Sequence, residues 1–60
     1  MTFEEWMKEV NQEILNRTMG AISYNDLDDW HYRDAYDDGV SPAEAAEEAL
    51  ENDDMASMFL

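Results

Sequence analysis

The 60-residue chain has no cysteine, one proline, two glycines and only three lysine or arginine residues. Without cysteine it can form neither a disulfide nor a thiolate zinc site, and this composition fits a reducing compartment. No stretch approaches the roughly 20 apolar residues of a membrane span, and the N-terminus lacks the basic start and apolar run of a signal peptide. We therefore expect a cytoplasmic protein that does not enter a membrane.

Positive charge is scarce, because 16 Asp or Glu residues against three Lys or Arg give a formal net charge of -13. A small domain needs a net charge of only about 2 to 8 for solubility. A surface this acidic repels nucleic acid and anionic lipid, and it attracts basic surfaces such as those that bind DNA or RNA. We expect the partner to be a basic nucleic-acid-binding protein, with no direct contact to nucleic acid.

Length and hydropathy indicate a single acidic helical domain over residues 1–60. With 45% hydrophobic residues, two Trp, three Tyr and two Phe, the chain is too apolar for a disordered acidic tail. No run alternates at strand period, and there are no repeats or linkers. The chain is therefore predicted to be all-α, a small compact bundle of three to four short helices, and we expect a monomer.

The first helix is predicted from Thr2 to about Thr18. Thr2 and Glu5 have the spacing of a capping box, and apolar residues recur at helical spacing at Phe3, Trp6, Met7, Val10 and Ile14. Gly20 is predicted to end the helix in a left-handed conformation. Residues 23–29 are rich in Ser, Asn and Asp, which indicates a connector with room for one helical turn.

Two further helices are predicted in the second half of the chain. Asp28 or Asp29 is expected to cap a short helix through Asp38, which Gly39 ends. Ser41 followed by Pro42 predicts the start of the third helix. Its apolar face is formed by Ala45, Ala46, Ala49 and Leu50. After Asn52 either this helix continues or a separate turn docks, because Met55, Met58, Phe59 and Leu60 resume helical spacing.

The third predicted helix carries an acidic row. Glu44, Glu47, Glu48 and Glu51 lie at i, i+3, i+4 and i+7, where like charges destabilise a helix by about 0.2–0.5 kcal/mol per pair. A small domain tolerates this cost most readily when the row has a use. The candidate partner-binding residues are Glu44, Glu47, Glu48, Glu51, Asp34, Asp37, Asp38, Asp53 and Asp54.

Each basic residue has an acidic residue four positions away in the sequence. The expected pairs are Lys8 with Glu4, Arg17 with Glu13, and Arg33 with Asp29 and Asp37. On this pattern none of the three is free to bind phosphate.

Metal binding and catalysis are disfavoured, and no cofactor is expected. Asp26 and Asp28 begin like a calcium loop, but Trp30 and His31 occupy positions that need a ligand and a glycine. His31 has no Cys or Ser neighbour with which to form a nucleophilic pair, and exposed carboxylates lack the concave site that acid–base catalysis needs. Trp6 and Trp30 are expected in the core or at its rim. We therefore expect a protein that is not an enzyme.

The segments YRDAYDDGVSPAEAAEEAL (32–50), GAISYNDL (20–27) and FEEWMKEV (3–10) resemble a family of small acidic proteins of phages and mobile elements. In size and charge the chain is also similar to anti-CRISPR inhibitors that mimic DNA. That resemblance implies action in a host bacterial cell against a type I CRISPR surveillance complex (Cascade), whose basic DNA-binding groove such inhibitors occupy. It carries over no catalytic or binding residue.

The function predicted on these grounds is that of an acidic DNA mimic. One alternative differs only in partner, a restriction enzyme. Another is a small interaction or regulatory module that binds through an apolar groove or its C-terminal Met/Phe/Leu stripe, while its acidity serves mainly solubility.

Overall fold

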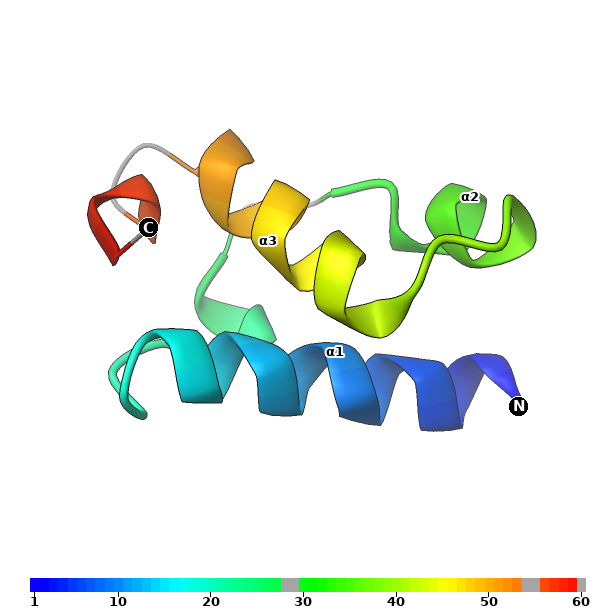
Figure 1. Ribbon diagram of the computed structural model, residues 1–60, viewed down its shortest axis with the longest axis horizontal. Helices are drawn as coiled ribbons and strands as arrows, with labels where there is room; N and C mark the ends of the chain where they lie inside the picture. Colours follow the sequence, from blue (N-terminus) through cyan, green and yellow to red (C-terminus); the bar gives the residue numbers. More distant parts are fainter. Residues whose placement is uncertain (28–29, 54–55, 60) are drawn as a thin grey trace.

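A computed structural model describes residues 1–27, 30–53 and 56–59. The chain forms helices α1 (Phe3–Arg17), α2 (Tyr32–Asp37) and α3 (Pro42–Asn52). A short 3-10 helix, η1 (Tyr24–Asp26), lies between α1 and α2, and a second one, η2 (Ala56–Phe59), follows α3. None of the described residues lies in a strand, so the predicted all-α class is confirmed. Figure 1 shows α3 lying across α1, with α2 near the N-terminus and η2 at the opposite end.

The ends of α1 follow the local sequence. The backbone N–H of Glu5 donates to Oγ1 of Thr2, which is the N-cap, so the predicted start is confirmed. At the other end Gly20 has φ +81° and its N–H donates to the carbonyl of Leu15, as expected of a glycine that closes a helix. Met19 also adopts positive φ, at 56°, which the sequence did not indicate.

Helix α2 is shorter than predicted, and its predicted cap was wrong. The N-cap position is His31, which makes no capping hydrogen bond with its side chain, whereas Asp28 and Asp29 lie outside the described residues. Gly39 does end the helix, since its φ is +81° and the next N–H, that of Val40, returns to the carbonyl of Ala35.

Helix α3 begins where the Ser-Pro pair predicted. Oγ of Ser41 accepts the N–H of Glu44, and Pro42 fills the first helical position. The helix ends at Asn52, and Oδ1 of Asp53 then accepts the N–H of Ala56, the first residue of η2. Of the two predicted endings, the separate docked turn is therefore the one that forms.

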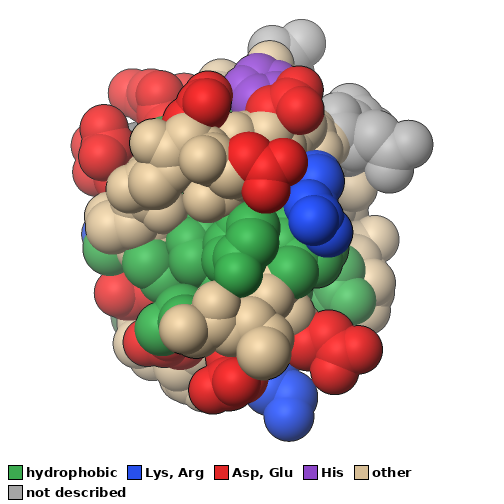
Figure 2. All heavy atoms as spheres, turned by 90° about the vertical axis from the view of Figure 1, so that its right-hand side faces the viewer, with side chains coloured by type: hydrophobic (Ala, Val, Ile, Leu, Met, Phe, Trp, Pro, Cys, Tyr) green, Lys and Arg blue, Asp and Glu red, His purple; other side chains and the backbone are tan. Residues whose placement is uncertain are grey.

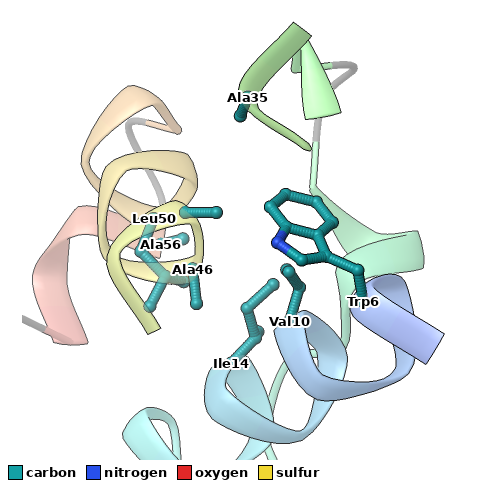
Figure 3. Packing of buried hydrophobic residues seen from close by; sticks show 8 residues of the cluster. Trp6, Val10, Ile14, Ala35, Ala46, Leu50 and Ala56 are labelled. Carbon is teal, nitrogen blue, oxygen red and sulfur yellow. The ribbon is translucent and has the colours of Figure 1, made fainter. Parts of the chain in front are cut away.

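The core lies between α1 and α3. Figure 3 shows Trp6, Val10 and Ile14 of α1 pointing toward α3, η2 and α2. The small side chains of α3 permit this close packing, because alanine leaves room for the large residues of α1. The buried hydrophobic residues are Trp6, Val10, Ile14, Ala35, Ala45, Ala46, Ala49, Leu50 and Ala56.

Trp6 also joins α1 to the connection between α2 and α3. Its Nε1 donates to the carbonyl of Val40 at 3.0 Å, and its ring contacts those of Phe3 and Tyr36. The expectation that the tryptophans belong to the core or its rim is confirmed, since Trp6 is buried and Trp30 is partly buried against the core. The orientation of α3, and therefore of its acidic row, is fixed by this packing.

Candidate partner-binding surface

The four glutamates of α3 lie on the side of the helix opposite its buried alanines. Glu44, Glu47, Glu48 and Glu51 are all exposed, whereas Ala45, Ala46, Ala49 and Leu50 are buried. A helix rises about 1.5 Å per residue, so the four carboxylates average one per about 3.5 Å along the axis. One strand of DNA carries a phosphate about every 3.4 Å. The row therefore matches a DNA strand in average axial charge spacing over about 10 Å, although the rises between successive glutamates are about 4.5, 1.5 and 4.5 Å.

Helix α2 adds three more of the candidate residues. Asp34, Asp37 and Asp38 are exposed, and Asp38 is the C-cap. Oδ1 of Asp37 lies 3.4 Å from Nε of Arg33, an ion pair in which both side chains are more than half exposed. Exposed pairs of this kind contribute little, so Asp37 can exchange Arg33 for a partner's cation at small cost.

The last two candidates differ from the others. Asp53 is only partly exposed, and its carboxylate caps η2 through the N–H of Ala56. Asp54 lies outside the described residues. The structure therefore gives Asp53 a structural role that the sequence analysis did not assign to it.

Two of the three cations have the acidic neighbours that the sequence predicted. Arg17 lies 3.0 Å from Glu13, and Arg33 pairs with Asp37 and lies 5.1 Å over the Phe3 ring. The predicted pair of Lys8 with Glu4 was wrong, since no described carboxylate lies within 4.0 Å of Lys8. Lys8 and Glu4 nevertheless border the same hollow, together with Met7 and Tyr24.

Negative charge is spread over more than α3. Three of the four acids of α1, Glu4, Glu5 and Glu9, are exposed as well. Figure 2 shows acidic side chains on both sides of a band of hydrophobic side chains at the end of the molecule that carries α2. A basic partner is therefore attracted from many directions, and its final orientation must depend on local features of the surface.

One such local feature escaped the sequence analysis. Trp30 and His31 stack with ring centroids 4.3 Å apart, and together with Glu48, Glu51 and Asn52 they line a shallow hollow of about 290 Å³. No residue spacing in the sequence predicts this hollow, because the connector before α2 contacts α3 only in the folded chain. From the sequence, Trp30 was expected only in the core or at its rim.

The described residues contain no group of three or more His, Cys, Asp or Glu side chains arranged to hold a metal ion. Within the same part of the chain, no helix is long and apolar enough to cross a membrane.

Comparison with known proteins identifies a family and phage-encoded relatives, but no activity. The family model described as "Family of unknown function (DUF5419)" matches residues 2–54. The chain is 43% identical over 53 residues to the "Gene 87 protein" of Mycobacterium phage L5. The match covers 88% of this chain and 96% of that protein. It is 40% identical over 53 residues to the "Gene 87 protein" of Mycobacterium phage D29, with 88% and 94% covered. No solved structure matches the chain.

Proposed function

We propose a function for this chain, which belongs to the family of unknown function DUF5419. It is an acidic DNA mimic that blocks a basic DNA-binding protein of the host. A type I CRISPR surveillance complex is the first partner we infer. Relatives encoded by two mycobacteriophages support an action inside an infected bacterium, where such complexes attack phage DNA. A restriction enzyme presents the same kind of basic DNA-binding surface.

The observation that carries the proposal is the exposed glutamate row of α3. A helix whose start and buried face are both fixed holds its carboxylates at an average axial spacing close to that of DNA phosphates. A groove that binds DNA pairs its lysines and arginines with phosphates and gains affinity from released counterions. A carboxylate row of similar charge density can occupy the same cations.

The charge of the whole molecule is similar in amount to that of a DNA duplex of the same length. The longest dimension of the fold is 28 Å. At one charge per ~1.7 Å, a DNA duplex of that length carries about 16 phosphates. The chain carries 16 Asp and Glu residues and, after its three cations are counted, a net charge of -13. A groove that accepts a short duplex would therefore meet a similar amount of negative charge.

The test measures binding of the pure protein to a type I surveillance complex at two salt concentrations, with target DNA as competitor. We expect binding that excludes the DNA and weakens as salt rises. The pair Glu47→Lys and Glu51→Lys should weaken it by about thirtyfold, from about 1 kcal/mol for each reversed charge. Thermal stability should be unchanged or higher, because like-charge contacts on α3 are relieved.

A matched control separates the row from net charge alone. Glu5→Lys with Glu9→Lys reverses two exposed glutamates of α1 at the same i,i+4 spacing. This control should lose much less affinity than the α3 pair. Equal inhibition by the α3 variant and the wild type would refute the proposed role of the row, and absence of binding at low salt would remove the CRISPR complex as partner.

A different binding mode has one observation in its favour. Met58 of η2 is 77% exposed, so part of the C-terminal apolar stripe is available for contact; Met55 and Leu60 lie outside the described residues. If this stripe binds the partner, removal of residues 58–60 should reduce affinity more than the α3 reversals do, and salt should have little effect.

A further inference from the structure

The hollow beside the end of α3 combines an aromatic wall with a carboxylate wall. Trp30 and His31, from the connector before α2, form the aromatic wall, and Glu48 and Glu51 form the carboxylate wall. Asn52 lies at the same end of the helix. The residues of the two segments are 17 to 22 positions apart in the sequence, so the site exists only in the folded chain.

The aromatic wall is fixed in position while it stays accessible. The Trp30 ring stacks on His31 with an interplanar angle of 29°, and Tyr32 meets it edge-on at 5.1 Å. Trp30 is nevertheless only partly buried. An indole face carries negative electrostatic potential and is the best of the aromatic surfaces for a cation. Because its neighbours hold the ring, little rotational freedom is lost when a ligand binds.

The other wall is unusually negative for the end of a helix. Helix C-termini carry partial negative charge and favour a Lys, Arg or His in the last turn. The last turn of α3 has no basic residue, and Glu51 occupies it instead. Glu48 lies one turn earlier on the same side, also exposed. The charge here opposes the stability of the helix, and within the described residues no Lys or Arg of the chain lines the hollow.

We propose that this hollow binds the guanidinium group of an arginine side chain. The group would lie against the indole of Trp30 and donate hydrogen bonds to the carboxylates of Glu48 and Glu51. Arginine fits better than lysine because its planar group stacks on aromatic rings and pairs with carboxylates through two parallel hydrogen bonds. The inference deepens the proposed function and rests on it for the source of the arginine, the DNA-binding groove of the basic partner.

The experiment uses the intact protein with blocked arginine, Nα-acetyl-arginine amide, as probe and the equivalent lysine derivative as control. The indole N–H signals of Trp30 and Trp6 are followed by NMR. The Trp30 signal should move and saturate, whereas that of Trp6, whose N–H donates to Val40 inside the fold, should not. Blocked arginine should bind about threefold more tightly than blocked lysine.

Two variants of equal charge isolate the site. Glu48→Gln with Glu51→Gln removes the carboxylate wall, while Glu44→Gln with Glu47→Gln removes the same charge from the same helix outside the hollow. The first pair should weaken arginine binding by about fivefold and the second by less than twofold. Equal losses, equal binding of lysine, or a Trp30 signal that does not saturate would each overturn the proposal.

The two proposals can fail separately, because the titration contains no partner complex. Saturable arginine binding at Trp30 would stand even if no CRISPR complex bound the protein. Conversely, if the protein bound the complex through its glutamate row while arginine left the Trp30 signal unchanged, only the proposed arginine site would be refuted.

Discussion

Thr18 illustrates how a single polar side chain connects α1 to the loop that follows it. It is the one polar residue among the described side chains that is buried, with 1% of its surface exposed. Its Oγ1 lies 2.9 Å from the carbonyl of Ile14 and 3.1 Å from that of Ile22, and it accepts the N–H of Ile22. The hydroxyl therefore accepts the N–H of Ile22 in the loop and adds a second donor to the carbonyl of Ile14, which already accepts the N–H of Thr18.

Replacing Thr18 by valine should destabilise the fold without changing its shape. The two side chains have nearly the same volume, but Thr18→Val leaves the N–H of Ile22 without its acceptor, whereas the carbonyl of Ile14 keeps the backbone N–H of residue 18. An unsatisfied buried group costs about 1–3 kcal/mol. We expect a loss of that size in the free energy of unfolding, measured by urea denaturation followed by circular dichroism. Unchanged stability would mean that water replaces the hydroxyl.

At the scale of the element, α3 combines a favourable beginning with an unfavourable end. Glu44 lies in the first turn, where a carboxylate interacts well with the helix dipole. Glu51 lies in the last turn, where the same charge is unfavourable, and it is three and four residues from two other glutamates, Glu48 and Glu47. The two ends of one acidic row should therefore respond oppositely to loss of charge.

This difference gives a prediction with its own internal control. Glu51→Gln should raise the free energy of unfolding by about 0.5–1 kcal/mol, since it removes repulsion and an unfavourable dipole interaction. In a chain of this size that is a rise of a few degrees in melting temperature, about 2–8 °C. Glu44→Gln removes the same charge and should lower the melting temperature or leave it unchanged. Thermal denaturation of both variants at low salt checks it, and equal shifts would show that only net charge matters.

The elements that the sequence predicted correctly are those whose signals are local. The cap formed by Ser41, the proline that follows it, and the Thr2 cap of α1 each act within four residues, so they act whatever the rest of the chain does. The buried faces of α1 and α3 were likewise readable from helical spacing. The acidic row was predicted as one side of a helix for the same reason.

What the sequence could not provide depends on contacts between distant segments. The start of α2 at Tyr32 follows the packing of Trp30 and Tyr32 against the core, not an aspartate cap. The role of Asp53 appears only because η2 docks through the buried Ala56. The hollow of Trp30 and Glu48 is formed by two segments that are distant in the sequence, and no local pattern encodes their contact.

At the scale of the whole molecule, one charge distribution has opposite consequences for folding and for binding. A net charge of -13 is carried on a fold whose extents are 28 × 18 × 16 Å. At 0.01 M salt the screening length is about 30 Å, so every acidic group repels every other one; at 0.1 M it falls to about 10 Å. Repulsion within the folded state should therefore weaken as salt rises.

We therefore predict that salt stabilises this protein while it weakens binding to the partner. Between 0.01 M and 0.3 M NaCl the melting temperature should rise by about 4–8 °C, the change that corresponds to about 1 kcal/mol in a domain of this length. Affinity for the basic partner should fall over the same interval, because counterion release contributes less. The variant with Glu47→Gln and Glu51→Gln carries two fewer charges and should show a smaller rise in melting temperature and a shallower fall in affinity. A melting temperature that rises with salt beside an affinity that does not change would assign the acidity to solubility and direct attention to the C-terminal turn, where Met58 is exposed.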